Sequence, residues 1–340
     1  MKLESFNFYL PPELIAQSPA EKRDNSRLLV YHTNTQKIED TVFSVLPNVI
    51  GRGNLIVFNN TKVIPARMYV NKPTGGKIEL LYINHHKDEL YNVLIKPSSR
   101  IKTGMALTLP GDTGTVTIIE RNTELNSFII RYTPKKDVTM FKVFETYGEM
   151  PVPPYIKTKL IDQERYQTVY AESPGAIAAP TAGLHFTREL LGTLKSGDNI
   201  LANITLHVGI GTFRPVTSEM IESHKMLDEY YSINTNTAEI LNTAITQEMN
   251  NIIAVGTTVM RTLETYKETG KNEGWTNKYI YPGYKFGITK KIITNFHLPK
   301  STLFILICSI TGIDEAQRIY AHAVKQKYRF YSFGDAMIIL

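Results

Sequence analysis

The sequence predicts an α/β main domain, built on a mixed, barrel-like sheet, with a small all-β barrel domain inserted in it. Between residues 63 and 150, short β-branched runs alternate with turns rich in Gly, Pro and Asn, which is typical of a compact barrel or sandwich. After residue 151, strand-like and helix-like runs alternate, which favours an α/β layer. The expected division is therefore 1–62 plus 151–340 for the main domain and 63–150 for the insertion.

The hydrophobic pattern places the individual elements. Strands are expected at 28–32, 54–58, 77–83, 90–95, 106–109, 114–120, 127–133, 203–208, 252–255 and 291–296. Helices are expected at 238–250, 261–270 and 314–330, while the apolar segment 301–310 is left unassigned. The prolines at 151, 153 and 154 exclude a helix there and indicate a stiff connector.

Composition excludes several classes of protein. With one cysteine, Cys308, in an apolar run, neither a disulfide framework nor a cysteine-rich metal site can form. The start of the chain lacks the apolar core of a signal peptide, and no apolar run is long enough to span a bilayer. We therefore expect a cytoplasmic protein without membrane contact. The net charge of +6 permits a polyanionic partner such as RNA without requiring one.

Three segments rich in Gly, Pro and Thr each carry one histidine, His185, His207 or His297. Such segments favour neither regular helix nor regular strand, and turns of this kind often border a pocket. We expect the three to converge on one cavity for a small molecule. Each imidazole could be a general acid or base, or a hydrogen-bonded core histidine. Their spacing does not match a metal site, and no metal is expected.

A candidate anion site follows the strand that ends near Val255. Gly256 makes a turn, and Thr257 or Thr258 can cap the helix that begins there. The free N–H groups of a helix start favour an anion, and Arg261 one turn later offers a guanidinium to a carboxylate or phosphate. The alternative is a capped helix with a surface arginine. The G-x-G of Gly209 and Gly211 lacks the third glycine of a dinucleotide fingerprint and predicts a tight turn.

Aromatic residues interleaved with basic ones suggest contacts with nucleic acid. Tyr170 lies in RYQTVYA, and the segment KQKYRFYSFGDAM combines Lys325, Lys327 and Arg329 with Tyr328. Aromatic rings can stack on unpaired bases while cations contact phosphates. The alternative is a helix end whose aromatic rings pack inward.

Taken together, long strings of the sequence resemble one family. VFNNTKVIPAR, GEMPVPPYIK, AAPTAGLHFT, TLHVGIGTFRPV, AVGTTVMRTLE, YPGYKFG, ITNFHLPKSTLF and YRFYSFGDAM occur in the order seen in S-adenosylmethionine:tRNA ribosyltransferase-isomerases. The resemblance covers essentially the whole chain. It implies transfer and isomerisation of the ribosyl part of S-adenosylmethionine onto 7-aminomethyl-7-deazaguanine at the wobble position of tRNA. The product is epoxyqueuosine-tRNA, and adenine and methionine leave.

The resemblance also implies partners and site residues. S-adenosylmethionine is a co-substrate, no cofactor is tightly bound, tRNA is the partner, and a monomer is favoured. His185, His207, His297 and Asp335 are the catalytic candidates, although Asp335 could equally cap a turn. The candidates for substrate binding are Thr181, Gly183, Gly209, Gly211, Thr257, Thr258, Arg261 and Tyr170. The candidates for tRNA binding are Lys325, Lys327, Arg329 and Tyr328.

The chain departs from the family pattern at three positions. Asn60 stands where the family has aspartate, Val259 where it has serine, and Leu227 where it has histidine. These departures put individual roles in doubt and leave the histidine strings intact. Two other functions remain open: an RNA methyltransferase that uses S-adenosylmethionine, and a non-catalytic RNA-binding module with the β domain as its platform.

Overall fold

The structure is a computed structural model. It describes all residues except 73, 124–125, 136, 154, 157–161, 210, 212–214 and 248–250, and it leaves the side chains of His86 and Lys87 undescribed. Most of the string GIGTF and the end of the helix expected at 238–250 therefore lie outside the described residues.

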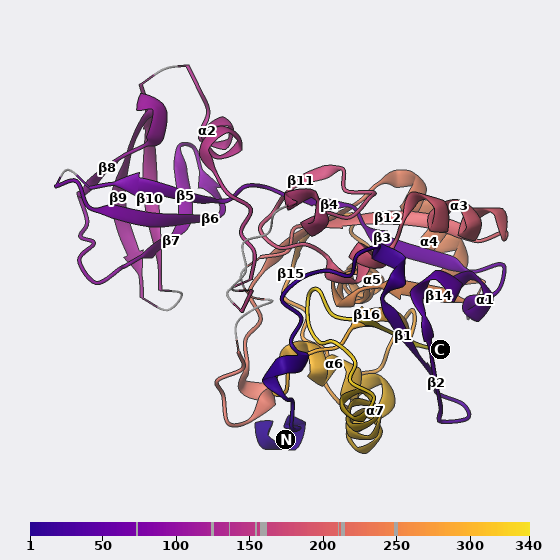
Figure 1. Ribbon diagram of the computed structural model, residues 1–340. Coiled ribbons are helices and arrows are strands. Elements are labelled where there is room, and N and C mark those ends of the chain that lie inside the picture. Colours follow the sequence, from indigo (N-terminus) through magenta and orange to yellow (C-terminus); the bar gives the residue numbers. More distant parts are fainter. Residues whose placement is uncertain are drawn as a thin grey trace. The chain divides into compact units, whose positions relative to one another are not determined.

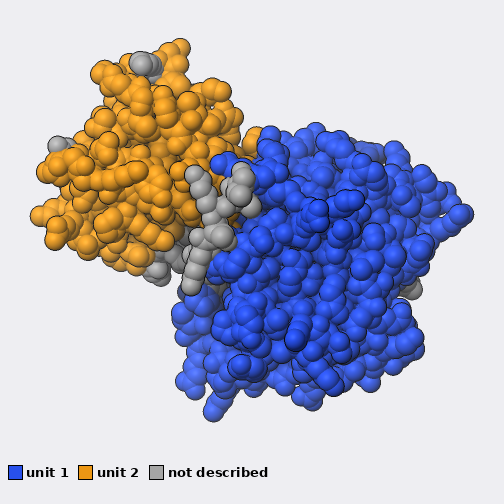
Figure 2. Space-filling view, viewed as in Figure 1, with its two compact units in different colours: residues 1–62, 154–173, 179–340 blue, residues 63–153, 174–178 orange. Residues whose placement is uncertain are grey.

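The described chain forms two compact units, which Figures 1 and 2 display. Unit 1 contains residues 1–62, 154–173 and 179–340, and unit 2 contains residues 63–153 and 174–178. The expected division has the same boundary after residue 62 and a second one after residue 150. Nothing in the sequence pattern assigns the short return at 174–178 to the inserted unit.

A nine-stranded mixed sheet forms the centre of unit 1, as the sequence analysis predicts for the main domain. Its spatial order is β15 (Glu273–Thr276), β13 (Glu229–Ile233), β12 (Ile200–Leu206), β3 (Leu55–Asn59), β14 (Ile252–Val255), β16 (Lys291–Asn295), β17 (Ala336–Ile339), β1 (Arg27–His32) and β2 (Lys37–Val42).

The middle of this sheet is parallel. β3 pairs in parallel with β12 and β14, and β14 pairs in parallel with β16. Every residue of β3 is buried, because strands in the middle of a parallel sheet are covered on both faces. This explains why the sequence shows a continuous apolar run there instead of an alternating one. β17 is antiparallel to β16 and places Ala336 opposite Asn295.

Helices cover the sheet of unit 1. They are α1 (Leu46–Ile50), α3 (Arg188–Ser196), α4 (Thr235–Thr246), α5 (Thr257–Thr269), α6 (Thr302–Thr311) and α7 (Ile313–Lys325). Short 3-10 turns occur at η1 (Leu3–Phe6), η2 (Pro12–Leu14), η3 (Arg23–Asn25), η4 (Phe43–Val45), η6 (Gln163–Tyr166), η7 (Thr181–His185) and η9 (Ile221–Ser223). Phe186, Leu190 and Leu194, in and before α3, share one core with alternate residues of the sheet.

Local sequence explains where several of these helices begin. Thr187, Asn234 and Ser301 each accept a hydrogen bond from a backbone N–H in the first turn of α3, α4 and α6. The segment 301–310, left unassigned above, is the helix α6. It is buried almost all round, so its apolar residues show no one-sided helical period. Among the described residues, no helix is both long and apolar enough to cross a membrane.

Unit 2 is built around a closed antiparallel barrel, which confirms the predicted all-β fold of the insertion. Around the barrel the strands are β10 (Ser127–Pro134), β7 (Leu90–Lys96), β6 (Lys77–Lys87), β5 (Arg67–Asn71), β8 (Ala106–Thr108) and β9 (Gly114–Asn122). Register shifts between Ile129 and Ile130 and between Tyr82 and Asn84 mark bulges that help a sheet to curve.

The barrel core is closed by a helix. α2 (Met140–Tyr147) contributes Met140, Val143 and Phe144 to the same core as the inward residues of the strands. Unit 2 also contains the 3-10 turn η5 (Pro110–Asp112). β4 (Thr61–Val63) and β11 (Ser173–Ala176) form a separate two-stranded sheet, in the segments where the chain passes from one unit to the other.

Candidate active site

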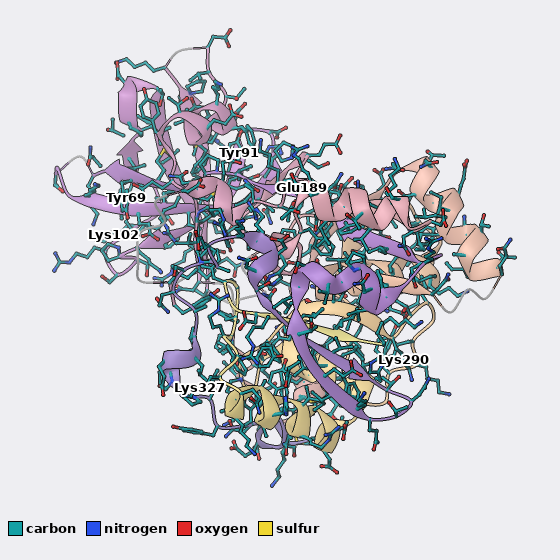
Figure 3. All side chains as sticks on the ribbon, turned by 45° about the vertical axis from the view of Figure 1, so that its right-hand side comes forward. Tyr69, Tyr91, Lys102, Glu189, Lys290 and Lys327 are labelled. Atoms are coloured by element: carbon teal, nitrogen blue, oxygen red, sulfur yellow. The ribbon has the colours of Figure 1, made fainter. Side chains whose placement is uncertain are left out.

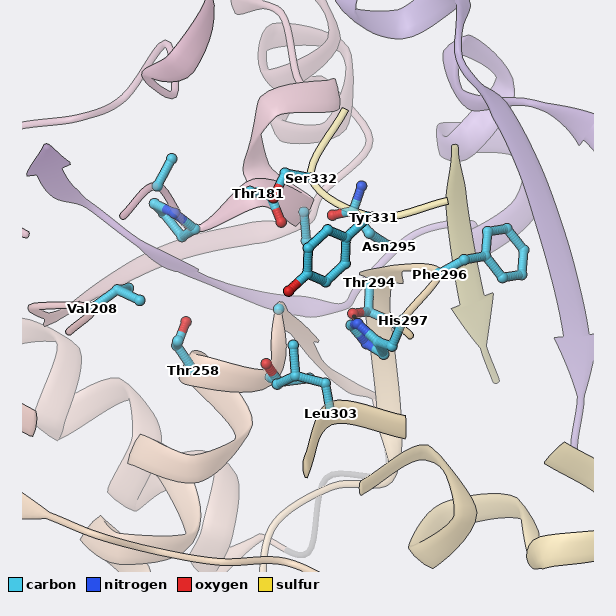
Figure 4. Close-up of a pocket in the computed structure, with 15 residues that line it drawn as sticks. Thr181, Val208, Thr258, Thr294, Asn295, Phe296, His297, Leu303, Tyr331 and Ser332 are labelled. Atoms are coloured by element: carbon cyan, nitrogen blue, oxygen red, sulfur yellow. Dashed lines mark hydrogen bonds between the residues drawn. The ribbon is translucent and has the colours of Figure 1, made fainter. Parts of the chain in front are cut away.

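A pocket in unit 1 lies where several distant segments meet (Figure 4). It contains about 520 Å³ of space not filled by atoms, part of which is open to solvent. The residues that line it are Ala179, Pro180, Thr181, Ala182, Val208, Gly256, Thr257, Thr258, Thr294, Asn295, Phe296, His297, Leu303, Tyr331 and Ser332.

The topology of the sheet explains why these segments meet. β12, β14 and β16 run in the same direction, and each leads directly into the pocket, at Val208, Gly256 and Phe296 respectively. Because β17 is antiparallel to β16, the residues before β17, Tyr331 and Ser332, arrive at the same edge. The crevice at the carboxyl ends of parallel strands is the usual ligand site of open α/β sheets.

Gly256 forms the turn between β14 and α5 in the pocket wall. Its φ of 95° and ψ of 155° lie in a region that only glycine adopts readily. Gly256 is the residue before the first turn of α5, and it has no side chain that could cap the helix. The start of α5, with Thr257 and Thr258, lines the pocket.

His297 is the one predicted catalytic histidine that lines the pocket. Its Nε2 lies 3.0 Å from Oγ1 of Thr294, and its backbone N–H donates to the hydroxyl of Tyr320 over 3.2 Å. The side chain is buried, and burial lowers the pKa of His297 to about 3. The imidazole is therefore neutral at neutral pH, where it can donate and accept hydrogen bonds.

His185 does not line the pocket but contacts a residue that does. Its Nδ1 is 2.7 Å from Oγ of Ser26, and its Nε2 is 3.0 Å from Nδ2 of Asn295, which does line the pocket. Burial lowers the pKa of His185 to about 4. Both ring nitrogens are thus occupied by protein groups, and the ring is linked to the pocket wall through Asn295.

His207 lies beside the pocket, whereas its neighbour Val208 lines it. The Nδ1 atom of His207 is 2.8 Å from Oγ1 of Thr61, and the ring stacks on Tyr230 with centroids 6.0 Å apart. Burial lowers the pKa of His207. The expectation that three imidazoles share one cavity therefore needs correction: the three segments converge, but only His297 presents its ring to the pocket.

Arg261 needs a second correction, because it does not line the pocket. Its Nη1 lies 2.5 Å from Oε2 of Glu229, and its Nε donates to the carbonyl of Lys278. Both partners of the ion pair are buried, with exposures of 5% and 4%. The guanidinium is thus a buried group of the interior and not a surface group, and its Nη2 has no hydrogen-bond partner among the described residues.

Asp335 is held by the backbone. Its carboxylate accepts hydrogen bonds from the N–H groups of Arg27 and Arg329 and from the Arg329 guanidinium, and it is buried. This arrangement matches the turn-capping alternative. A carboxylate with these partners is not placed to remove a proton from a ligand in the pocket.

The remaining substrate-binding candidates lie in different surroundings. Thr181 lines the pocket. Gly183 and Tyr170 pack so closely against each other that a Cβ on Gly183 would lie 2.0 Å from the Tyr170 hydroxyl. The N–H of Gly209 donates to Oε1 of Glu229, which ties the turn after β12 to the buried ion pair.

Gly211 packs near Leu227, the position where the family has histidine. The other two departures are accommodated by hydrogen bonds at Asn60 and by packing at Val259. Asn60 accepts from the Thr205 hydroxyl and donates to Glu172, and Val259 is fully buried in α5.

The basic segment after α7 also differs from expectation at one position. Tyr328 is completely buried, donates to Asp40 and lies under the Arg27 guanidinium. Its ring is therefore not accessible for stacking on a base, which corrects that assignment in favour of inward packing. Lys325 and Lys327 are exposed, and Lys327 extends from the surface in Figure 3.

Two residues that are not among the predicted site residues, Tyr331 and Asn295, line the pocket. Tyr331 places its ring in it (Figure 4), 4.0 Å from the ring of Tyr155, and has an unusual φ of 76° for a residue with a side chain. Asn295 ends β16 within the same string as His297. The string around His297 was therefore the sequence signal for Asn295. The sequence does not show in which direction each side chain of that string points.

The pocket is uncharged. None of the described residues that line it is Lys, Arg, Asp or Glu. In the part of the chain that the structure describes, no group of three His, Cys, Asp or Glu side chains could hold a metal ion.

The fold and this pocket define an α/β protein with a pocket at the carboxyl ends of parallel strands, the usual ligand site of such sheets. Comparison with known proteins identifies the family. Residues 3–339 match the family model described as "Queuosine biosynthesis protein", and the chain belongs to this family.

Curated relatives carry a more specific name. Two proteins called S-adenosylmethionine:tRNA ribosyltransferase-isomerase, from Halothermothrix orenii and Natranaerobius thermophilus, are each 46% identical to the chain. Each alignment covers 100% of the chain and 99% or more of the relative. The crystal structure of an S-adenosylmethionine tRNA ribosyltransferase from Thermotoga maritima matches 99% of the chain and 100% of that protein, with 33% identity and a TM-score of 0.56.

Proposed function

We propose that this protein transfers and isomerises the ribosyl part of S-adenosylmethionine onto 7-aminomethyl-7-deazaguanine in tRNA. The product is epoxyqueuosine-tRNA, with adenine and methionine released. The observation that carries the proposal is identity of 46% over the full length to relatives that bear this name. The pocket at the carboxyl ends of β12, β14 and β16 is the place that we assign to S-adenosylmethionine.

The charge of the pocket suits this substrate. S-adenosylmethionine carries a positive sulfonium, which a lysine or arginine in the wall would repel. The described lining has neither, and His297 is neutral because burial lowers its pKa. The methionine carboxylate needs a partner of opposite sign. We assign it to the N–H groups at the start of α5, beside Thr257 and Thr258, in place of Arg261.

The reaction requires proton transfers at the sulfonium nucleoside. The sulfonium makes the adjoining ribose CH₂ acidic, so a base can remove a proton there, after which adenine leaves and the tRNA amine attacks. His297 is the histidine that we place against the substrate, where it can donate or accept a hydrogen bond. The other catalytic candidates act from further away: His185 through Asn295, His207 through its contact with the Thr61 hydroxyl, and Asp335 through the backbone that it holds.

The tRNA is a polyanion, and the reaction belongs in the cytoplasm, where tRNA is found. We propose that the exposed Lys325 and Lys327 contact its phosphates. Arg329 is about one third exposed and pairs with Asp335, so its first role is to hold that turn. A double Lys→Gln change at 325 and 327 should lower tRNA affinity. It should also reduce the slope of log affinity against log salt concentration by about one for each lysine.

Isotope transfer tests the proposed function. The protein is incubated with tRNA that carries the 7-aminomethyl base and with S-adenosylmethionine labelled either in the ribose or in the methyl group. Ribose label should enter the tRNA, while methyl label should leave with methionine, in amounts equal to the adenine released. Methyl label in the tRNA would identify a methyltransferase. Binding of tRNA without release of adenine would identify a non-catalytic RNA-binding protein.

A further inference from the structure

The side-chain oxygen of Asn295 is a buried acceptor without a donor. Asn295 is 3% exposed and lines the pocket, and its Oδ1 has no hydrogen-bond partner among the described residues. Its Nδ2, by contrast, lies 3.0 Å from Nε2 of His185. Buried polar atoms are nearly always paired, so an unpaired one in the wall of a pocket indicates a group that a ligand supplies.

We assign the end of the amide that faces inward from a chain of hydrogen bonds behind the pocket. The Ser26 hydroxyl donates to the carbonyl of Arg23 over 3.3 Å, so its oxygen is left to accept from His185 Nδ1–H at 2.7 Å. A neutral imidazole with a proton on Nδ1 has a lone pair on Nε2. Nε2 then accepts from the Asn295 amide nitrogen, and the amide oxygen is turned away from His185.

His185 is held in its neutral form, since burial lowers its pKa to about 4. A protonated ring would donate from both nitrogens and reverse the amide. Figure 4 draws the amide in this orientation, with the Asn295 oxygen on the side of Thr181 and the nitrogen pointing away from it.

We propose that Asn295 Oδ1 accepts a hydrogen bond from the exocyclic amino group of the purine of S-adenosylmethionine, and that Ser26 and His185 are positioning residues that hold the amide in this orientation. The inference rests on the proposed function, because it names a contact of the same substrate in the same pocket.

Two features favour the purine over the other donors of the substrate. The methionine ammonium is charged, and the described lining of the pocket offers no carboxylate to it. Tyr331 provides an aromatic ring in the pocket, and its backbone N–H donates to the carbonyl of Phe296, the residue next to Asn295. An aromatic face beside a hydrogen-bond acceptor is an arrangement that recognises a nucleobase by stacking and by its edge.

The tautomer of His185 can be measured directly in the unmodified protein. Long-range proton–nitrogen NMR correlations of protein labelled with ¹⁵N-histidine distinguish a proton on Nδ1 from one on Nε2, and a His185→Gln variant assigns the signal. We expect the Nδ1–H tautomer. The Nε2–H tautomer would overturn the proposal, because the amide would then present its nitrogen to the pocket.

Substrate discrimination tests the contact itself. The rate of adenine release from S-adenosylmethionine is compared with the rate of hypoxanthine release from its 6-oxo analogue, S-inosylmethionine. The protein should prefer the 6-amino substrate by about tenfold in kcat/KM, the effect of one hydrogen bond. Ser26→Ala removes the acceptor for Nδ1–H and frees the amide to reverse, so this preference should shrink towards unity. Ser26→Thr keeps the hydroxyl and should retain it.

The failures of the two proposals are distinguishable. If the unmodified protein releases no adenine in the presence of the tRNA, the proposed function fails. If it releases adenine but Ser26→Ala leaves the preference for the 6-amino substrate unchanged, only the role of Asn295, His185 and Ser26 fails. A purely structural role for Ser26 would lower both rates together and leave their ratio unchanged, which also contradicts the proposal.

Discussion

Nη1 of Arg261 lies 2.5 Å from Oε2 of Glu229, and both side chains are buried. Glu229 Oε1 also accepts the N–H of Gly209, so the pair joins α5, β13 and the turn after β12. A buried ion pair is costly to break from one side, because the remaining charge has neither water nor a partner. The pair therefore connects the interior of unit 1 to a segment that borders the pocket.

Removing one partner of this pair should destabilise the protein. For Arg261→Met we expect a loss of about 3–5 kcal/mol in the free energy of unfolding, measured with urea. The double variant Glu229→Gln/Arg261→Met leaves no unpaired charge and should recover most of that loss. A rise of about tenfold or more in the KM for S-adenosylmethionine in the double variant would contradict this account and favour Arg261 as the ligand of the methionine carboxylate.

Replacing the glycine at the start of α5 should disturb both stability and binding. Gly256→Ala places a Cβ on a backbone with φ of 95°, which costs about 1–3 kcal/mol or forces the turn to shift. Because this turn lines the pocket, the KM for S-adenosylmethionine should rise as well. Gly270→Ala is the matched control: φ there is 63°, a Cβ would touch nothing within 4 Å, and the site is the far end of α5. Equal KM values in the two variants would argue against a role for this turn in binding.

The buried histidines should make stability depend on pH. The folded state lowers the pKa of His185 from 6.5 to about 4, so between these values the unfolded chain binds more protons than the folded one. The contribution of neutral His185 to the free energy of unfolding is therefore complete above about pH 6.5. This free energy falls by about 3 kcal/mol as the pH falls towards 4.

Urea unfolding at several pH values measures this effect. His185→Gln should lower stability at neutral pH and flatten its decline below pH 6.5. His32→Gln, at a partly exposed strand end, is the control and should leave the decline unchanged. An acid decline of the same steepness in His185→Gln and in the unmodified protein would contradict the assigned neutral state.

Tyr331 should matter for binding through its ring. It lines the pocket, packs on Tyr155, and holds a φ of 76° that a side chain makes unfavourable. Stacking of a base on an aromatic ring contributes about 1–3 kcal/mol, so Tyr331→Ala should raise the KM for S-adenosylmethionine about tenfold or more. Tyr331→Phe keeps the ring and should bind nearly as well. Equal binding by Tyr331→Ala and the unmodified protein would remove the ring from the site.

The fold class was predictable because strands and helices leave periodic patterns. The runs at 54–58 and 252–255 are continuous and apolar, as central parallel strands require, and the short runs of the insertion mark a barrel. The helix α6 was not predictable, because burial on all sides removes the periodicity that would identify it. The return of residues 174–178 to unit 2 leaves no local signal at all.

The site was predictable at the level of segments but not of side chains. The strings around His185, His207 and His297 do meet, yet the sequence contains no sign that the His185 ring points to Ser26 and the His207 ring to Thr61. Likewise, the basic residues around Tyr328 suggest an exposed segment after α7, whereas the Tyr328 side chain is buried. Direction depends on the tertiary path of the backbone, which a local pattern does not encode.

A crystal structure of the protein with S-adenosylmethionine bound tests the central claim most directly. We predict that the purine stacks on Tyr331 with its amino group within hydrogen-bond distance of Asn295 Oδ1, and that the methionine carboxylate lies at the start of α5. A nucleoside bound outside this pocket, or one whose carboxylate is held by Arg261, would contradict the account.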